Sequence, residues 1–371
     1  MKIEERRVHV ELGDRSYDIV IGLELLDRLG DLAKEVGIPT TSSCLVVTDA
    51  NVAGAGHLEK ALASLQKAGY KASEAVIPPG EESKSLSQAS VLYDKAFEAG
   101  LDRRSAIFAI GGGVVGDLAG FIAATYMRGI AFVQVPTTVL AHDSSVGGKV
   151  AVNHPKGKNV IGAFHQPKLV VYDISTLGTL PAREIRSGVA EVIKHGLIWD
   201  ADFFTWMEAS IEKVCSLDPE ILADLLARSC SVKAAVVEKD EKEDNLRAIL
   251  NFGHTLGHAI ESLSSYGTYT HGEAIAIGMV FAAELSLQYG RIDRDTVERI
   301  RNLFIRTGLP TEIPSDLDPV ELLNLMRQDK KATGGKLTFV LMSAIGHVDV
   351  VKDADEATVL ELLRRLGRNE Q

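Results

Sequence analysis

The sequence predicts an α/β fold in two parts: a parallel-sheet domain spanning residues 1–179, followed by a mostly α-helical domain spanning residues 180–371. Three observations predict it. A chain of 371 residues is longer than one typical domain core requires. Its first half alternates short β-rich runs with amphipathic stretches, and near 176–181 this pattern changes to long helical stretches. Strand–helix alternation predicts a parallel sheet that is covered on both faces and binds ligands at the carboxyl ends of its strands.

In the first half, apolar segments bounded by Gly, Pro or Asp predict the strands, and 3.6-residue periodicity predicts the helices. A hairpin is expected at 8–12 and 17–21, with buried parallel strands at 44–48, 72–77, 105–110, 131–135 and 169–172. Helices are expected at 23–36, 56–68, 86–99 and 114–124.

In the second half, helical periodicity dominates. Helices are expected at 183–198, 219–240, 252–264, 272–289, 294–306 and 319–326, and strands only at 337–341 and 347–350. We expect a ligand-binding cleft between the two domains.

Composition excludes several classes of function. The 40 Lys and Arg residues are outnumbered by 51 Asp and Glu residues, and a net charge of −11 argues against a nucleic-acid partner. The longest apolar run, 274–283, is too short to span a bilayer, and the charged N-terminus does not resemble an export signal. Three widely spaced cysteines suit a reducing compartment. We therefore expect a cytoplasmic protein with no membrane partner.

A glycine-rich segment follows the strand expected at 105–110. Gly111-Gly-Gly-Val-Val-Gly-Asp117 is a strand–glycine–helix transition, where backbone N–H groups can bind a phosphate. A tight turn in a packed domain is the alternative, and the spacing departs from the dinucleotide fingerprint. At the end of an earlier strand, Asp49, followed by Asn51, could hold a ribose hydroxyl or simply cap a helix.

Three of the ten histidines fall within eighteen residues. His254 and His258 are one helical turn apart, and His271 follows. Three satisfied surface histidines are the alternative, but the clustering favours a zinc site made of imidazoles and a carboxylate. Thr255 excludes the zincin motif. Glu191 is a candidate carboxylate, although an ordinary ion pair with Lys194 would also explain it.

Several cations accompany these motifs. They are Lys149, Lys156, Lys158, Arg128, Lys233, Arg247, Lys330 and Lys331. Most could be solvated surface charges, but Lys149 follows an unusual Ser- and Gly-rich segment. In an acidic protein such a set suggests a substrate that carries both phosphate and carboxylate.

Five segments together, 111–117, 143–149, 157–167, 188–194 and 251–271, resemble the 3-dehydroquinate synthase family of the sugar-phosphate cyclase superfamily. The resemblance implies a Rossmann-like domain, a helical domain, tightly held NAD, a divalent metal (usually Zn²⁺, with Co²⁺ possible) and a homodimer. It also implies conversion of a phosphorylated sugar acid, 3-deoxy-D-arabino-heptulosonate 7-phosphate, to 3-dehydroquinate and phosphate. The implied steps are transient oxidation by NAD, phosphate elimination, reduction, ring opening and aldol closure.

The resemblance also implies roles for individual residues. Metal ligands would be Glu191, His254 and His271. NAD contacts would come from Asp49, Asn51, Gly80, Glu81, Glu82, Ser83, Lys84, Gly113, Val114, Val115, Gly116, Asp117, Thr137, Thr138, Lys149, Lys158, Thr176, Leu177, Gly178 and Thr179. Substrate contacts and catalysis would involve Asp143, Lys149, Lys194, Lys233, Arg247, Asn251, His258, Lys330 or Lys331, Asn159, and Arg128 from a partner subunit.

Three rival functions remain at this stage. A sister cyclase acting on a sugar phosphate without a carboxylate would differ at Lys233, Arg247 and Asn251, all of which suit a carboxylate here. A polyol dehydrogenase on the same fold would not need so many phosphate-binding cations. A non-catalytic nucleotide-binding module would not need the metal ligands.

Two residues, Pro79 and Ser83, depart from the pattern of the family that this chain resembles. Their departure leaves the contacts with the adenosine part of NAD open.

Overall fold

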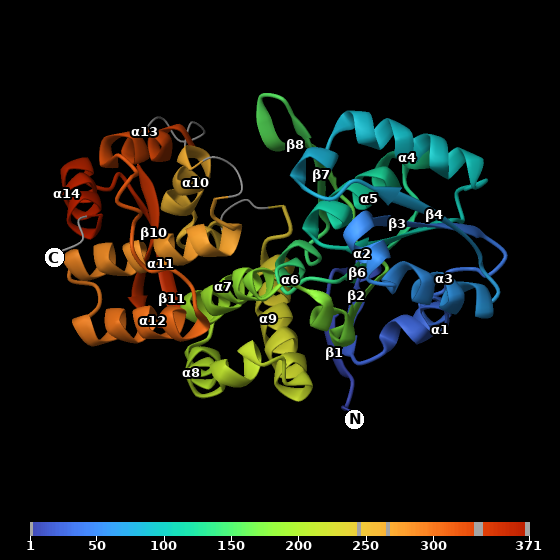
Figure 1. The fold of residues 1–371 in the computed structure, drawn as a ribbon, viewed down its shortest axis with the longest axis horizontal. Helices are drawn as coiled ribbons and strands as arrows, with labels where there is room; N and C mark the ends of the chain where they lie inside the picture. Colours follow the sequence, from blue (N-terminus) through green and yellow to red (C-terminus); the bar gives the residue numbers. More distant parts are fainter. Residues whose placement is uncertain (1–2, 243–245, 265–267, 330–336, 368–371) are drawn as a thin grey trace. The chain divides into compact units, whose positions relative to one another are not determined.

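The computed structural model describes residues 3–242, 246–264, 268–329 and 337–367 of the chain (Figure 1). It contains two compact units. The first comprises Met1–Leu180 and Leu217–Lys242, and the second comprises Pro181–Ser216 and Glu243–Gln371. The N-terminal unit is α/β and the C-terminal unit is mostly helical, which confirms the predicted fold class.

The first unit is built on a seven-stranded sheet with the strand order β1-β2-β9-β6-β5-β3-β4. Every neighbouring pair is parallel except the antiparallel pair β1 and β2. The strands are β1 (Arg6–Val10), β2 (Tyr17–Gly22), β3 (Ser43–Asp49), β4 (Lys71–Ile77), β5 (Ala106–Gly111), β6 (Ala131–Pro136) and β9 (Leu169–Asp173). All seven correspond to the strands expected from the sequence.

Helices cover both faces of this sheet (Figure 1). One core cluster joins the sheet to η2 (Leu25–Arg28), α1 (Leu29–Glu35) and α3 (His57–Lys67). The other joins it to α4 (Leu86–Glu98) and α5 (Gly113–Thr125). Strand β4 was expected to be buried but is an edge strand, so several of its side chains are exposed.

A two-stranded ribbon in this unit was not expected from the sequence. It consists of β7 (Lys149–His154) and β8 (Gly157–Phe164), and β7 packs on α5. Its Lys, Gly and Asn residues hide the apolar alternation that normally marks a strand. The remaining short elements here are η1 (Gly13–Arg15), α2 (Ala50–Gly54), η3 (Glu81–Ser83), η4 (Tyr126–Arg128), α6 (Ala141–Ser144) and η5 (Ile174–Thr179).

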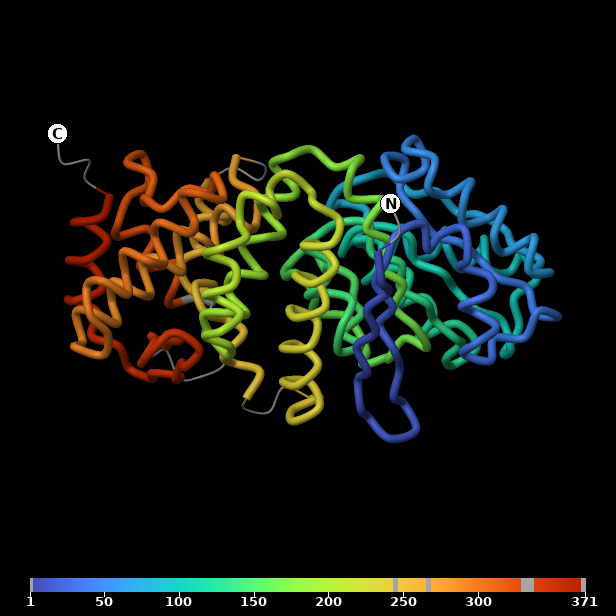
Figure 2. Tube along the Cα trace, turned by 90° about the horizontal axis from the view of Figure 1, so that it is seen from below, coloured from blue at the N-terminus to red at the C-terminus, as the bar shows by residue number. Residues whose placement is uncertain are grey.

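Helix α9 (Pro219–Lys239) belongs to the first unit, whereas the expected boundary at residue 179 placed it in the second. It runs beside the ribbon formed by β1 and β2 (Figure 2). The side chain of Arg6 in β1 donates to Asp224 of α9 at 3.0 Å. Sequence order alone does not show this long-range packing.

The second unit is a helical assembly with one small ribbon, β10 (Thr338–Ala344) and β11 (His347–Lys352). Its helices are α7 (Ala182–Trp199), α8 (Ala201–Cys215), η6 (Leu246–Asn251), α10 (His254–Leu263), α11 (His271–Gln288), α12 (Arg294–Thr307), α13 (Pro319–Asp329) and α14 (Glu356–Leu366). Helices α8 and α14 were not among the expected elements. Within the described ranges, none of the helices combines the length and the apolar character that a membrane span requires.

Glycines allow α7, α10 and α11 to pack closely. A Cβ atom on Gly278 of α11 would overlap the carbonyl oxygen of Gly253, which directly precedes α10. A Cβ atom on Gly272 would overlap the backbone of Ser187 in α7. Gly253 itself has φ +80°, a conformation that side chains other than glycine rarely adopt. These contacts position the first residues of α10 and α11, His254 and His271, relative to α7.

We predict that Gly278→Ala lowers the free energy of unfolding by about 2–3 kcal/mol, because the added methyl group meets backbone rather than a movable side chain. Thermal and urea unfolding measure the loss. Gly54→Ala is the matched control, since nothing lies within 4 Å of its added Cβ. Equal stability of the two variants would contradict the close-packing argument.

Candidate functional site

The residues expected to contact NAD follow the carboxyl ends of five parallel strands in the first unit. Asp49 ends β3, Gly80 comes after β4, the glycine-rich segment follows β5, Thr137 follows β6 and Thr176 comes after β9. The carboxyl ends of parallel strands meet at one edge of a sheet, which is where such folds bind ligands. The structure therefore brings these segments to a single edge of the first unit.

The glycine-rich segment forms the N-terminus of α5. Gly112 is the N-cap residue and no side chain caps this end of the helix. A Cβ atom on Gly112 would lie 3.3 Å from Thr138, and one on Gly113 would lie 3.2 Å from Ser144. The uncapped N–H groups of α5 and their positive dipole end suit a phosphate group.

A buried ion pair lies beside this helix. Lys84, with a side chain only 5% exposed, pairs with Asp117 of α5. Burial raises the pKa of the Asp117 carboxyl, and the Lys84 ammonium opposes that shift. The pair ties the segment around η3 to the glycine-rich helix.

Two further observations bear on a nucleotide. The hydroxyl oxygen of Thr137 is buried and has no hydrogen-bond partner in the part of the chain that the structure describes. Such an atom fits a bound polar ligand, because a buried hydroxyl without a partner is costly. Asp49 caps α2 by accepting from the backbone N–H groups of Asn51 and Val52, so the capping interpretation of this residue is confirmed. Both hydrogen bonds use Oδ1.

The other expected cofactor residues lie in this unit as well. Thr176 donates to the carbonyl oxygen of Asp173 at the end of β9, and Thr179 donates to that of Thr176. The Thr179 hydroxyl also lies 2.9 Å from Nε2 of His57. Lys149 begins β7, and Lys158 lies in β8. Their roles toward NAD stay predictions.

Three potential metal ligands converge in the second unit. Oε1 of Glu191 lies 3.3 Å from Nε2 of His254 and 3.1 Å from Nε2 of His271. Glu191 is in the middle of α7 and is 2% exposed. Two imidazole nitrogens and a carboxylate oxygen are the donors that zinc prefers, and they fit a small divalent cation. The expected grouping of these three residues is thus present in the structure.

Neighbouring charges set the protonation of this cluster. Burial acts to raise the pKa of Glu191, but the Lys194 ammonium, which pairs with its Oε2, and His254 hold that pKa well below its usual range. Burial, together with the Lys194 charge, lowers the pKa of His254 to about 4. At neutral pH the carboxylate is therefore ionised and His254 is neutral, as metal ligation requires.

The pKa of His271 shifts in the opposite direction from that of His254. Burial lowers the pKa of an imidazole, yet hydrogen bonds with Glu191 and Glu261 raise the pKa of His271 to about 10. A metal cation at this position would displace that proton.

Glu191 and Lys194 form the ion pair that the sequence offered as an alternative explanation for Glu191. Both side chains are almost fully buried, so this pair is not a surface contact that contributes little to stability.

Both histidines are the first residues of helices, and this fixes the position of their backbones. His254 is the first residue of α10, and its Nδ1 lies 3.1 Å from the carbonyl oxygen of Phe252. His271 is the first residue of α11, which begins with a capping box between Thr270 and Glu273. Arg183 of α7 binds the same Glu273 carboxylate through two nitrogens at 2.6 and 2.8 Å.

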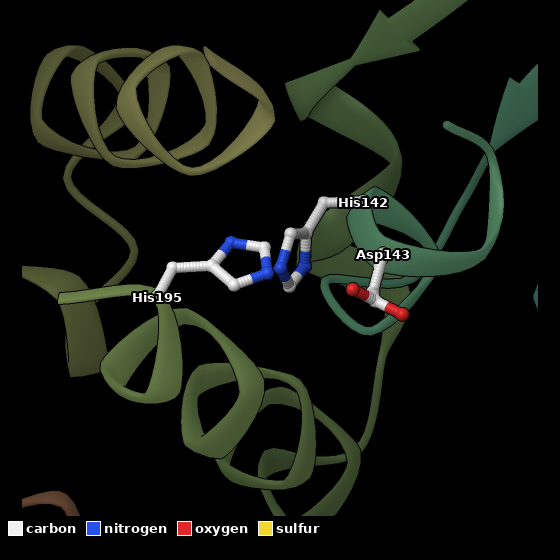
Figure 3. A group of neighbouring side chains, drawn as sticks. All are labelled: His142, Asp143 and His195. Atoms are coloured by element: carbon white, nitrogen blue, oxygen red, sulfur yellow. The ribbon is translucent and has the colours of Figure 1, made fainter. Parts of the chain in front are cut away.

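The expected substrate residues are divided between the units. In the first unit, Lys233 of α9 donates to the carbonyl oxygen of Asp143 at 2.6 Å and pairs with its carboxylate at 2.8 Å. Asp143 and its neighbour His142 lie in α6, and Figure 3 shows both side chains on this helix. Arg128 in η4 and Asn159 in β8 are exposed.

In the second unit, Lys194 is buried beside Glu191, and Arg247 is only 1% exposed in η6, which ends at Asn251. The ring of His258 meets that of His254 edge-on, with 5.2 Å between centroids. Lys330 and Lys331 lie outside the described residues.

One residue of the cluster was not predicted. Oε2 of Glu261 lies 3.2 Å from Nδ1 of His271, and Glu261, His258 and His271 form a second group of potential ligands. Its spacing was a usable signal, because Glu261 follows His254 by seven residues, two helical turns, and so shares its face of α10.

Comparisons with known proteins agree with this architecture. A model of the 3-dehydroquinate synthase N-terminal domain matches residues 74–187, and a model of the C-terminal domain matches residues 188–332. The 3-dehydroquinate synthase of Desulforamulus reducens is 53% identical over 357 residues, which cover 96% of this chain and 99% of that protein.

Solved structures of two other synthases are similar throughout. A crystal structure of 2-deoxy-scyllo-inosose synthase complexed with carbaglucose-6-phosphate, NAD⁺ and Co²⁺ has a TM-score of 0.87 at 28% identity, covering 97% of this chain and 100% of that one. ValA, the 2-epi-5-epi-valiolone synthase of Streptomyces hygroscopicus with NAD⁺ and Zn²⁺ bound, has a TM-score of 0.85 at 26% identity, covering 96% and 98%.

The α/β unit and the helical unit give this chain the fold of the class of synthases that these two structures represent. Within that class, the sequence matches are to a narrower group. The chain belongs to the 3-dehydroquinate synthase family.

We predict that Lys84→Met destabilises the first unit by about 3 kcal/mol at pH 7.5, because it leaves the Asp117 carboxylate buried without its partner. The folded-state pKa of Asp117 is raised, so its charge becomes more costly as pH rises, and the loss should shrink at pH 4.5. Unfolding curves at both pH values measure this difference.

Asp117→Asn in the Lys84→Met background should restore much of the lost stability. Lys95→Met, which removes an exposed partner of Glu98, is the matched control and should change little at either pH. A loss that is equal at the two pH values would contradict an unpaired Asp117 as the cause.

Proposed function

We propose that this chain converts 3-deoxy-D-arabino-heptulosonate 7-phosphate to 3-dehydroquinate and phosphate, the second step of the shikimate pathway. The observation that carries the proposal is the convergence of Glu191, His254 and His271 on one point, in a chain 53% identical to a 3-dehydroquinate synthase over almost its full length. Free thiols at Cys44, Cys215 and Cys230 are consistent with a cytoplasmic location.

The reaction needs two bound groups, for which this chain has suitable residues. When bound, NAD would supply a hydride acceptor, and a divalent metal ion would stabilise negative charge on substrate oxygens. The α5 N-terminus and the Thr137 hydroxyl are suited to holding the dinucleotide. The carboxylate and two imidazoles on α7, α10 and α11 are suited to holding the metal.

Buried cations support a doubly anionic substrate. Arg247 is 1% exposed, and a charged side chain is rarely buried so deeply without a functional or structural reason. Lys233 is 6% exposed and pairs with the Asp143 carboxylate. In a site that excludes water, such cations bind a carboxylate strongly and fix its orientation. We assign the substrate carboxylate to Lys233, Arg247 and Asn251, and the phosphate to Asn159 and Arg128.

The remaining residues act on proton positions and orientation. Lys194 neutralises one oxygen of Glu191 and leaves Oε1 directed at the two imidazoles. Asp143 is held by Lys233, so its carboxylate has a defined direction. His258 lies next to His254, and we assign it to the substrate side of the cluster. The chain's main task is to hold one flexible substrate through several reactive poses.

A sister cyclase acting on a sugar phosphate without a carboxylate is the second candidate. The likeness to 2-deoxy-scyllo-inosose synthase favours it structurally, at 28% identity. The 53% identity to a 3-dehydroquinate synthase and the buried Arg247 favour the first candidate.

We predict that the purified protein, given Zn²⁺ and substoichiometric NAD, releases phosphate and 3-dehydroquinate in equal amounts from the heptulosonate phosphate. Phosphate assay and product chromatography measure both. His271→Ala should abolish turnover yet retain NAD binding in the first unit, which shows that the fold persists. Equal turnover of glucose 6-phosphate, which lacks a carboxylate, would reassign the chain to a sister cyclase.

A homodimer in which Arg128 serves the partner subunit is also part of this proposal. Met127, Arg128 and Gly129 have φ values of 52°, 66° and 118°, and consecutive residues with positive φ are strained in a way that is typical of functional segments. A Cβ atom on Gly129 would lie 3.9 Å from His165, directly after β8, and Phe164 and Val160 of β8 are exposed apolar residues. Exposed apolar side chains beside a strained arginine support an interface there.

Mixing two inactive variants tests this arrangement. Arg128→Ala and His271→Ala chains, unfolded and refolded together, should regain up to about a quarter of wild-type activity, because each mixed dimer contains one intact site. Each variant refolded alone is the control. If Arg128 acted within its own subunit, the mixture would stay inactive.

A further inference from the structure

The two histidines of the metal-ligand cluster have different second partners. Nδ1 of His254 faces a backbone carbonyl oxygen, that of Phe252, at 3.1 Å. Nδ1 of His271 instead faces a side chain, Oε2 of Glu261, at 3.2 Å. The Nε2 atoms of both rings point to the same oxygen, Oε1 of Glu191.

An imidazole that binds a metal through one nitrogen carries its proton on the other. In His271 the two nitrogens face two different carboxylates, Glu191 on one side and Glu261 on the other. A proton on Nδ1, donated to Glu261, leaves the lone pair of Nε2 directed toward the Glu191 side. The opposite assignment would direct the lone pair away from Glu191 and His254.

Burial favours the first assignment. The Glu191 side chain is 3% exposed and is already paired with Lys194, whereas the Glu261 side chain is 20% exposed. His254 adds a neutral imidazole to the Glu191 side, which completes a three-donor set there. The alternative set of His258, Glu261 and His271 would use Glu261 itself as a ligand.

We propose that Glu261 is a positioning residue: by accepting the Nδ1 proton of His271, it sets the tautomer and ring orientation with which His271 binds a divalent cation through Nε2. The inference rests on the proposed metal site and deepens it. Glu261 lies on α10 and His271 begins α11, so this hydrogen bond also joins the two helices that carry the histidine ligands.

The hydrogen bond has a consequence for metal affinity. A carboxylate that accepts from a ligating imidazole increases the basicity of the ring, and loss of such a partner typically lowers metal affinity about 10- to 100-fold. The backbone carbonyl that faces His254 cannot be removed by substitution. Glu261 is therefore the partner whose substitution can test whether this hydrogen bond affects metal affinity.

The test measures metal binding by the full-length chain rather than turnover. Zn²⁺ affinity is determined by competition with a chromophoric chelator, and the Co²⁺ protein is examined by visible absorption. We expect Glu261→Ala to weaken Zn²⁺ binding about 10- to 100-fold, and Glu261→Gln to weaken it less, because the amide oxygen can still accept from Nδ1. In both variants the Co²⁺ bands should shift while keeping the intensity of the wild-type coordination number.

Two variants calibrate these results. His271→Ala, which removes a proposed ligand, should weaken binding by at least a further factor of ten and change the intensity of the Co²⁺ bands. Glu361→Gln neutralises an exposed carboxylate on α14 and should bind Zn²⁺ like the wild type. Circular dichroism of each variant verifies folding, and the nearly isosteric Glu261→Gln keeps the test valid if Glu261→Ala does not fold.

The outcomes separate this inference from the proposed function. Zn²⁺ affinity within twofold of wild type in both Glu261 variants, with a weakened His271→Ala, overturns the positioning role alone. A Glu261→Ala protein that loses Co²⁺ band intensity as fully as His271→Ala overturns it in favour of Glu261 as a ligand. Wild-type affinity in His271→Ala refutes the metal site itself, and the positioning role with it.

Discussion

The contact on which the second unit depends is the meeting of one carboxylate oxygen, Oε1 of Glu191, with the Nε2 atoms of His254 and His271. A carboxylate buried in the middle of α7 would be costly by itself. The Lys194 ammonium offsets that cost at the other oxygen, so the charge is retained where two imidazoles can use it. The close packing of α7, α10 and α11 holds the three donors within reach of a single cation.

The first unit has a different feature, a helix N-terminus that is suited to an anion. Its sheet brings five strand ends to one edge, and there α5 begins without a side-chain cap. Backbone N–H groups and a helix dipole can attract a phosphate, so this end of α5 can be lined by glycine and threonine. The nearby cation Lys84 is neutralised by Asp117 and stabilises the edge.

Each group that holds or positions the metal-ligand cluster has a second partner outside the cluster. Glu191 is supported by Lys194, His271 by Glu261, and the start of α11 by its capping box and Arg183. Each outer group satisfies a donor or acceptor that would otherwise be buried without a partner. This organisation explains how several charged side chains of the cluster keep fixed directions.

Local pattern in the sequence determined the strand and helix order, the glycine-rich start of α5 and the grouping of His254, His258 and His271, because periodicity and spacing act over a few residues. Tertiary structure alone decided that α9 packs with the first unit, that β7 and β8 form a ribbon, and that Glu191 faces His254 while Glu261 faces His271. Strand pairing and long-range packing make those choices, and packing joins side chains far apart in the chain, such as Glu191 and His271 or Arg6 and Asp224.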